Sequence, residues 1–519
     1  MTSENPTLTG PDFGRGIDLS DVAPNGMLLG HANGEAVLVS RTGDEVFAIS
    51  AHCSHYGGPL AEGVLDGDTI HCPWHHACFN VRTGEALRAP ALSPVACWQV
   101  EQRDGKVLVT NKIERDPLTP TMRVPANHDH VTRLERVVIL GAGAAGSAAA
   151  EMLRRSGFEG EVTLVDVEEE APYDRPNVSK DFLAGKMSEE YLPLRPDGFY
   201  VQHGIDILRG RVTSINPEAK SVSVAGHDDV FYSALLLATG AEPIRLELPG
   251  DERPHVHYLR SLTDGRAVIA ATETARRAVV VGASFIGLEV AASLRARGLD
   301  VHVVARESLP LELVLGPQLG AVVRDLHEKH GVSFHLGHTP ARIDDDAVVL
   351  DDGTRLPADL VVIGVGVRPR LELAADAGIA LDRGVLVNEY LETSVPGIFA
   401  AGDIARWPDP HSGQRIRVEH WALAQRMGQA AARNMLGARE RFTPVPFFWS
   451  NHYDMSISYV GHAESWDTTR VEGIENDSAL AVRFERDGQL LALATVARDE
   501  LSLHTEQTME RLGAVRHGP

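Results

Sequence analysis

Two short segments in the first part of the chain carry thiols and imidazoles at close spacings. One residue separates Cys53 from His55, and two residues separate Cys72 from His75. Two thiolates and two imidazoles can bind a single zinc ion, or a [2Fe–2S] cluster in which the histidines hold one of the irons. The Cys-x-His pair is too close for a common zinc finger, and the nearby glycines and prolines favour loops. The cluster is therefore the favoured interpretation, with these four residues as its ligands.

The second segment, Cys72-Pro-Trp-His75, resembles the ligand loop of the Rieske family. In high-potential members a disulfide joins the two loops. The matching positions in this chain are Gly58 and Trp74, so the resemblance implies that this disulfide is absent. The family's loop serine, which donates a hydrogen bond toward the cluster, is replaced by Ala77. We therefore predict a potential in the lower part of the Rieske range, which spans about −150 to +300 mV.

A glycine-rich turn follows the apolar residues 137–140. Gly141, Gly143 and Gly146 form the pattern G-x-G-x-x-G ahead of an alanine-rich helix. The first glycine allows a tight turn, the second lets a pyrophosphate approach the backbone, and the third lets helix and strand pack. The helix N-terminus supplies N–H donors to the pyrophosphate. Asp166, at the end of the next predicted strand, is placed to bind a ribose hydroxyl.

Further motifs identify this nucleotide as FAD. They are Pro172-Tyr-Asp-Arg-Pro176, Leu237-Ala-Thr-Gly240, Gly397-Ile-Phe-Ala-Ala-Gly-Asp403 and Val418-Glu-His-Trp421. With them, residues 136 to about 450 resemble the FAD-dependent ferredoxin reductases and the apoptosis-inducing-factor-like flavoproteins. The resemblance implies FAD contacts from Ala145, Arg175, Lys180, Val212, Ala238, Thr239, Gly240, Arg260, Gly402, Asp403 and His420, with Trp421 as a candidate catalytic residue beside the isoalloxazine.

The positions of the cysteines restrict the flavin chemistry. Residues 136–519 contain no cysteine. The chain therefore lacks the redox-active pair that disulfide reductases of the glutathione or thioredoxin type need. Electrons must leave the flavin by another route, and the fused cluster is the nearest candidate. Cys78 and Cys97 are expected to be buried hydrophobic residues and not ligands.

A second glycine turn follows the apolar residues 279–281. Ser284 takes the place of the middle glycine, which weakens the motif. In the resembling reductases the matching glutamate, Glu289, lies near the nicotinamide, and the matching aromatic, Phe285, lies at the flavin face. Phe285 is equally suited to packing in the core. The predicted dinucleotide contacts are Gly282, Ser284, Ile286, Gly287, Arg306 and Gly366.

The choice between NADH and NADPH depends on the end of the strand that follows this turn. The acid that usually binds the NAD ribose would fall at Ala305. Arg306 could face the 2′-phosphate of NADPH, whereas Glu307 would serve NADH if the strand ends later. We favour NADH because the resembling families prefer it.

A chain of 519 residues is long enough for three or four domains. Residues 35–40 and 45–50 flank a glycine turn and predict a β hairpin in an all-β Rieske domain. The two glycine turns predict two α/β Rossmann-like domains of glutathione-reductase-like architecture, followed by a small α+β domain. The expected boundaries are 1–110 for the Rieske domain, 111–132 for a linker, 133–255 and 385–442 for the FAD domain, 256–384 for the NAD(P) domain and 443–519 for the C-terminal domain.

Charge and hydropathy exclude several classes of partner. The net charge of −23, with no run of basic residues, disfavours nucleic acid and anionic membrane surfaces. No apolar run approaches the roughly 18 residues that span a bilayer. We therefore expect no integral membrane segment and a cytoplasmic location. The oligomeric state is not fixed by the sequence, which allows a homodimer.

Together these features predict an electron-transfer enzyme. NAD(P)H would reduce FAD by hydride transfer, and single electrons would then reach the cluster and an acceptor such as an oxygenase, a cytochrome or a quinone. The domain order resembles the apoptosis-inducing-factor-like reductases with an N-terminal Rieske domain. Two alternatives are the reductase component of an oxygenase or nitrite-reducing system, and a slow-turnover flavin redox sensor. We hypothesise that the linker, residues 111–132, lets the Rieske domain dock or swing away.

Overall fold

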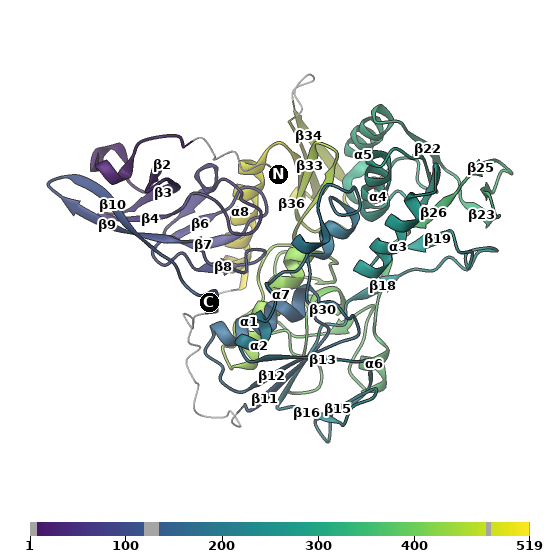
Figure 1. The fold of residues 1–519 in the computed structure, drawn as a ribbon, viewed down its shortest axis with the longest axis horizontal. Helices are drawn as coiled ribbons and strands as arrows, with labels where there is room; N and C mark the ends of the chain where they lie inside the picture. Colours follow the sequence, from purple (N-terminus) through teal and green to yellow (C-terminus); the bar gives the residue numbers. More distant parts are fainter. Residues whose placement is uncertain (1–7, 119–133, 474–478, 518–519) are drawn as a thin grey trace.

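The structure, a computed structural model, describes residues 8–118, 134–473 and 479–517. An all-β lobe built from the first part of the chain lies to one side of two α/β lobes and a C-terminal sheet (Figure 1). The predicted fold class is confirmed. The predicted linker begins inside the last strand of the all-β lobe, and its residues 119–132 lie outside the described part of the chain.

Two antiparallel sheets form the N-terminal lobe. The larger sheet has the order β1-β10-β9-β4-β3-β2, and the smaller has the order β5-β6-β7-β8. The predicted hairpin is present as β3 and β4. The strands are β1 (Ile17–Asp18), β2 (Met27–Ala32), β3 (Glu35–Thr42), β4 (Glu45–Ser50), β5 (Val64–Asp66), β6 (Thr69–His71), β7 (Cys78–Asn80), β8 (Ala86–Arg88), β9 (Cys97–Arg103) and β10 (Lys106–Ile113).

A parallel sheet of order β13-β12-β11-β17-β29 is the centre of the first α/β lobe. Its middle strand is apolar and buried, as expected for a parallel strand covered on both faces. The strands are β11 (Arg136–Leu140), β12 (Glu161–Asp166), β13 (Ile205–Arg209), β17 (Ala234–Leu237) and β29 (Ile398–Ala400). Smaller elements of this lobe are α2 (Phe199–Gln202), α6 (Glu372–Asp376), β14 (Val212–Asn216), β15 (Ser221–Val224), β16 (Val230–Phe231), β28 (Val385–Leu386), β30 (Ala405–Pro408) and β31 (Arg415–Ile416).

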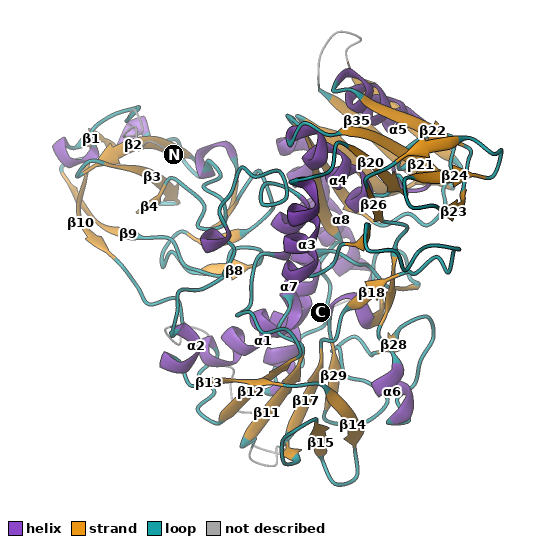
Figure 2. Cartoon of the chain, turned by 45° about the vertical axis from the view of Figure 1, so that its right-hand side comes forward, coloured by secondary structure: helices purple, strands orange, loops and turns teal. Residues whose placement is uncertain are grey.

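Helices α1 (Ala144–Arg155) and α7 (Trp421–Met435) of this lobe pack closely together (Figure 2). A Cβ atom on Gly428 of α7 would lie 2.1 Å from the carbonyl oxygen of Ala145, so only glycine fits at this crossing. The small residues of α1 therefore bring the start of α7 to the glycine turn that precedes α1.

The second α/β lobe repeats the design with a parallel sheet of order β19-β26-β20-β21-β22. Its strands are β19 (Val256–Tyr258), β20 (Arg277–Val281), β21 (Asp300–Ala305), β22 (Val332–Leu336) and β26 (Leu360–Ile363), and its helices are α3 (Leu262–Thr272), α4 (Phe285–Ala296) and α5 (Glu312–Lys329). An outer sheet contains β23 (Pro340–Ile343), β24 (Ala347–Leu350) and β25 (Arg355–Pro357). The antiparallel pair β18 (Ala241–Pro243) and β27 (Val367–Pro369) connects the two α/β lobes.

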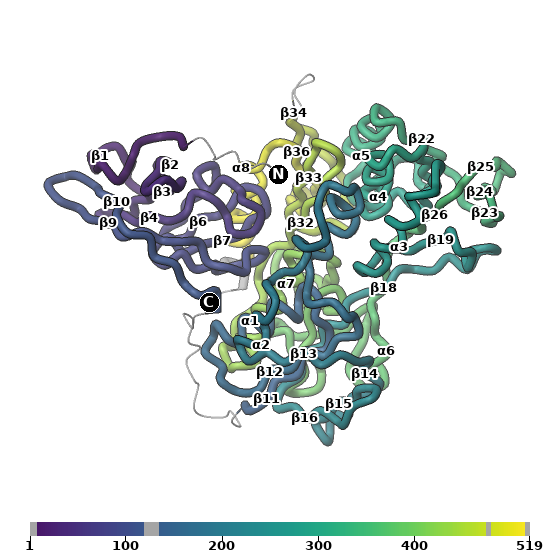
Figure 3. Tube along the Cα trace, in the orientation of Figure 1, coloured from purple at the N-terminus to yellow at the C-terminus, as the bar shows by residue number. Residues whose placement is uncertain are grey.

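The C-terminal lobe is an antiparallel sheet of order β32-β33-β36-β35-β34 with one long helix. Its elements are β32 (Phe447–His452), β33 (Met455–Gly461), β34 (Thr468–Gly473), β35 (Leu480–Arg486), β36 (Gln489–Val496) and α8 (Asp499–His517). Helix α8 contacts both this sheet and β5 of the N-terminal lobe, so the first and last parts of the chain lie side by side (Figure 3).

Candidate functional site

The two ligand loops of the N-terminal lobe bring the histidines together. His55 follows β4, His75 precedes β7, and their Nδ1 atoms are 3.3 Å apart with the ring planes almost perpendicular. Burial lowers the pKa of His55 to about 3 and holds the pKa of His75 well below its ordinary value. Both imidazoles are therefore neutral near pH 7, with nitrogen lone pairs available to a metal.

The same loops pair the two predicted cysteine ligands. Cys53 and Cys72 are buried, and their thiols share a hydrogen bond that raises the pKa of Cys53 and lowers that of Cys72. All four cysteines are free thiols in the structure. The other two, Cys78 and Cys97, are buried apolar residues as predicted.

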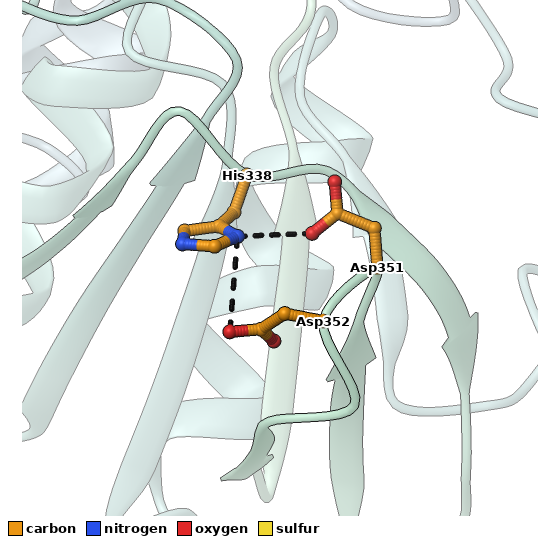
Figure 4. Close-up of side chains that lie close together, drawn as sticks. All are labelled: His338, Asp351 and Asp352. Atoms are coloured by element: carbon orange, nitrogen blue, oxygen red, sulfur yellow. Dashed lines mark hydrogen bonds and ion pairs between the residues drawn. The ribbon is translucent and has the colours of Figure 1, made fainter.

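The spread of the four ligand atoms favours a two-iron cluster over zinc. Among the described residues, only His338, Asp351 and Asp352 place three ligand-type atoms within 4.8 Å of one another (Figure 4). That group is an exposed hydrogen-bonded cluster on the outer sheet of the second α/β lobe, where His338 Nδ1 lies 2.9 Å from Asp351. The cysteines and histidines of the two loops do not close on one point, whereas the ligands of a single zinc all lie about 2.0–2.3 Å from it.

A cavity of about 1080 Å³ lies where both glycine turns face the C-terminal sheet. Gly141 and Gly282 begin the two turns at φ of +103° and +109°, a conformation that side chains rarely adopt. A Cβ atom on Gly143 would meet nothing within 4 Å, so this glycine leaves its part of the wall open. The predicted residues that line the cavity are Gly141, Gly143, Ala145, Asp166, Arg175, Lys180, Ala238, Thr239, Gly240, Arg260, Ser284, Phe285, Ile286, Glu289, Gly366, Gly402, Asp403, His420 and Trp421.

Five predicted residues lie outside the cavity wall. Cβ atoms on Gly146 and Gly287 would lie 1.8 and 2.1 Å from the carbonyl oxygens of the first glycines of their turns, so both serve helix–strand packing. Gly282 likewise packs against a backbone carbonyl. Val212 is a half-buried residue at the edge of the hydrophobic core, and the side chain of Arg306 is 75% exposed.

The charged groups of the wall are held in ion pairs. Arg260 donates to Asp403 at 2.8 Å, and Arg175 donates to Glu168 at 2.6 Å. Burial, together with the neighbouring Glu168, raises the pKa of Asp166, the predicted ribose ligand. Sequence reasoning missed Glu168, although its place two residues after Asp166 is a signal that could have found it.

Glu289 is the centre of a buried hydrogen-bond chain at the cavity. Its carboxylate is 5% exposed and accepts bonds from Ser179 Oγ at 2.6 Å, Lys180 Nζ at 2.9 Å and Ser450 Oγ at 2.7 Å. Ser450 in turn lies 3.2 Å from Nε2 of His452, which is completely buried. Because every carboxylate oxygen has a donor, the position of Glu289 is fixed.

We expect Ser450→Ala to destabilise the protein by about 1–3 kcal/mol, since a buried carboxylate loses one of its three donors. Urea denaturation measures the change. Ser456→Ala is the matched control, because Ser456 is exposed on the same hairpin and should change stability by less than about 0.5 kcal/mol. Equal effects of the two substitutions would contradict this role of Ser450.

Aromatic rings connect the cluster loops with the cavity wall. The ring of His75 lies 4.2 Å from the ring of Trp449, which lines the cavity. Phe448 forms another part of that wall. Its ring stacks on the ring of His420 with the centroids 4.0 Å apart, and the ring of Phe285 contacts it edge-on at 5.0 Å. Among the ring contacts of the described residues, Trp449 is the aromatic side chain that packs on the predicted histidine ligands and also lines the cavity.

Comparison with known families agrees with this geometry. Residues 135–428 match the family "Pyridine nucleotide-disulphide oxidoreductase", residues 17–99 match "Rieske [2Fe-2S] domain" and residues 447–515 match "Reductase C-terminal". No helix in the described part of the chain has the length and apolar character needed to cross a membrane.

Individual relatives span most of the chain. It is 32% identical, over 93% of its length, to apoptosis-inducing factor 3 of Homo sapiens, and the match covers 81% of that protein. It is 35% identical, over 69% of its length, to the anthranilate 1,2-dioxygenase system ferredoxin–NAD(+) reductase component of Burkholderia cepacia, of which 90% is covered. The crystal structure of the covalent putidaredoxin reductase–putidaredoxin complex matches 73% of this chain and 93% of that chain, with a TM-score of 0.70 and 33% identity.

The glycine-lined cavity, the paired thiols and imidazoles and these matches lead to one conclusion. The chain belongs to the pyridine nucleotide-disulphide oxidoreductase family, as an oxidoreductase that uses FAD and NAD(P)H and carries a Rieske [2Fe–2S] domain ahead of its reductase domains.

Proposed function

We propose that this protein takes a hydride from NADH and delivers single electrons, through its own Rieske domain, to an external acceptor. Bound FAD supplies the conversion from a two-electron donor to one-electron steps. The observation that carries the proposal is the packing of His75 on Trp449 at the wall of the cavity. It brings the predicted cluster ligands to the edge of the predicted flavin site within one molecule.

Residues of the chain have distinct tasks in this proposal. Arg260 and Asp403 hold each other at the cavity wall, where they orient the cofactor. The Lys180–Glu289 pair and Phe285 stand at the start of α4, where the nicotinamide would enter. The Rieske loops use Cys53 and Cys72 as thiolate ligands and His55 and His75 as imidazole ligands, the donor set that a Rieske cluster needs.

An anaerobic titration of the purified holoprotein with NADH, followed by absorbance and EPR, tests the proposal. We expect the flavin absorbance to fall and a reduced Rieske signal to grow in the same molecules. Dithionite provides the control that the cluster can be reduced. Loss of the flavin absorbance while the dithionite-reducible cluster stays oxidised would favour an external acceptor at the flavin, or the redox-sensor alternative.

We further propose NADH as the preferred donor, because a carboxylate stands beside Arg306. Arg306 Nε donates to Glu307 at 2.8 Å, so the negative charge of Glu307 would repel a 2′-phosphate bound at Arg306. The side chain of Glu307 is only 25% exposed. Glu307 lies two residues after the end of β21, close to the position from which an acid binds the ribose of NAD. The name of the Burkholderia relative, a ferredoxin–NAD(+) reductase component, supports the same choice.

We expect Glu307→Ala to lower the ratio of kcat/KM for NADH over that for NADPH by on the order of tenfold, the equivalent of one charged hydrogen bond. Steady-state kinetics with both nucleotides measure this ratio. Arg306→Ala is the control and should leave the NADH value unchanged. A wild-type protein that prefers NADPH, and loses that preference in Arg306→Ala, would reverse the assignment.

A second candidate is the reductase component of an oxygenase system, because the Burkholderia relative is named as one. In that case the acceptor is the oxygenase, which receives electrons from the Rieske domain. Coupled turnover with a purified Rieske oxygenase, compared with cytochrome c as acceptor, separates this role from a general reductase.

A further inference from the structure

The Rieske domain is attached to the reductase through a buried ionic cluster. Glu506 of α8 is completely buried and accepts bonds from His76 Nδ1 at 2.8 Å, Arg88 at 3.0 Å and Arg426 at 2.8 Å. His76 and Arg88 belong to the Rieske domain, whereas Arg426 lies on α7 of the first α/β lobe. A buried carboxylate is tolerated only while its partners stay in place, so this cluster favours one docked position.

A second set of contacts fixes the orientation of the docked domain. Arg195, 9% exposed, donates to Ser93 Oγ at 2.5 Å and to the carbonyl of Leu92 at 3.1 Å. Arg155, 3% exposed, pairs with Glu85 at 2.8 Å. Contacts at two separate sites prevent the domain from rotating about the Glu506 cluster.

This orientation turns the histidine side of the cluster loops inward. His75 is 8% exposed and packs on Trp449, and the hydroxyl of Tyr56 donates to Asp174 of the reductase. His75 is therefore shielded by Trp449 while the domain is docked, although Tyr56 at the rim of this side is 40% exposed. A separate acceptor protein has no direct contact with the ring of His75 in this position.

Trp74 marks the side that stays open. Its side chain is 41% exposed although its neighbours in sequence, Pro73 and His75, are buried. The indole packs on Gly58, because a Cβ atom there would lie 3.3 Å from the Trp74 ring and 2.8 Å from Cys72 Sγ. The backbone of Gly58 thus lies against both the exposed ring of Trp74 and Sγ of the predicted ligand Cys72.

Carboxylates lie near the loop of Cys72, two residues before Trp74. The charge of Asp499 acts on Cys72, and the charge of Glu62 acts on Asp499. Glu62 is exposed, as is Glu500, which follows Asp499 in the sequence. In the segment 498–500 two acids follow the single base Arg498. The net charge of −23 adds to the negative field.

We propose that a one-electron acceptor protein with a basic face docks on this open side, which we call the Trp74 face (Trp74, Glu62, Asp499 and Glu500), and takes electrons there. The inference rests on the proposed function, since electrons must first reach the cluster from the flavin. In the step itself the reduced cluster loses one electron and the acceptor gains it, with no bond made or broken. The cluster then receives electrons on its histidine side and passes them to the acceptor on its thiolate side.

The probe for the experiment is cytochrome c, a basic protein that accepts one electron. We expect the double substitution Glu62→Lys/Glu500→Lys to leave NADH-driven reduction of the cluster unchanged and to lower the rate of cytochrome c reduction on the order of tenfold at low salt, with a weaker dependence on ionic strength. Trp74→Phe should lower the same rate by a smaller factor. For this variant the rate of cytochrome c reduction is divided by the amount of reduced cluster measured by EPR. Carbodiimide cross-linking of cytochrome c to Glu62 or Glu500 gives a readout that is independent of turnover.

Matched controls lie in the small sheet of the first α/β lobe, away from the Rieske domain (Figure 1). Phe231 is 55% exposed on β16, and Glu218 and Asp228 are exposed in the same small sheet region. Phe231→Ala and Glu218→Lys/Asp228→Lys should leave cytochrome c reduction unchanged. Equal effects of the two charge reversals, or no effect of either and cross-links elsewhere, would overturn the Trp74 face. If NADH fails to reduce the cluster in the wild-type protein, the proposed function fails instead, while the cross-linking result still decides the docking surface.

Discussion

Glu506→Gln is expected to destabilise the protein by about 3–5 kcal/mol, the usual cost of removing one partner from a buried ion pair. The substitution keeps the shape of the side chain but removes the anion that Arg426 is paired with, and leaves Arg88 with Glu510 as its remaining carboxylate. Urea denaturation should show the loss, together with earlier unfolding of the Rieske domain. The result would demonstrate that the cluster is a structural attachment and not an incidental surface contact.

The pH dependence of this attachment follows from the same charges. Burial alone would raise the pKa of Glu506, but the charges of Arg88 and Arg426 outweigh it and hold that pKa well below its ordinary value of 4.5. A carboxyl whose pKa is lower in the folded protein stabilises it above its unfolded pKa, and the stabilisation is lost as the pH falls through the folded pKa. The domain should therefore stay attached at pH 5 to 8 and loosen only in stronger acid.

Glu510→Gln is the matched control for this experiment. Glu510 lies one turn further along α8 and pairs with Arg88 at 2.8 Å, but its side chain is 26% exposed. Its loss should cost no more than about 1 kcal/mol, as is typical of solvated ion pairs. A cost for Glu510→Gln as large as that for Glu506→Gln would show that burial does not set the strength of the attachment.

Cutting the linker tests whether the Rieske domain stays docked on the reductase or swings away from it. With a protease site inserted in residues 119–133, the two halves of the cut wild-type protein should co-elute in gel filtration, whereas the halves of the Glu506→Gln variant should separate. Wild-type halves that separate on cutting would restore the hypothesis of a domain that docks and swings away.

Local patterns in the sequence were enough to predict most of the residues that line the cavity, and to predict the two histidines that the cluster loops bring together. Each ligand pair of the cluster is one or two residues apart, and each glycine turn follows its own strand, so neither depends on the rest of the fold. Whether a motif residue faces the cavity or packs behind it was harder to predict. Gly146 and Gly287 fit their motifs but serve packing, and the side chain of Arg306 faces solvent, where it pairs with Glu307.

Contacts between distant segments could not be predicted in this way. His76 and Glu506 are 430 residues apart, and nothing near either residue indicates a buried ion pair. The contact of Trp449 with His75 likewise depends on how the Rieske domain docks. The sequence therefore indicated which cofactors the chain uses, and the packing between domains indicates how their predicted sites are arranged.

Trp449→Ala is expected to slow the reduction of the cluster by NADH by at least about tenfold, because displacing reacting groups by about 1 Å can cost about a hundredfold in rate. The substitution removes the ring on which His75 packs and opens a gap between the Rieske loops and the cavity wall. Stopped-flow absorbance separates the fast loss of flavin colour from the later reduction of the cluster. Trp449→Phe keeps an aromatic ring at the position and should fall between the alanine variant and the wild type.

The control for Trp449 is Trp466→Ala in the same C-terminal lobe. The ring of Trp466 lies 4.8 Å from the ring of Phe484, and this ring contact is not with the cluster loops. That substitution should lower stability and leave the rate of cluster reduction unchanged. If Trp449→Ala slows the cluster no more than Trp466→Ala does, the electrons reach the cluster by another contact. The reduction of the flavin itself should stay fast in both variants, since neither touches the Lys180–Glu289 pair. A loss at the flavin step would instead show that Trp449 shapes the nucleotide site, and the contact with His75 would then have no part in the electron path.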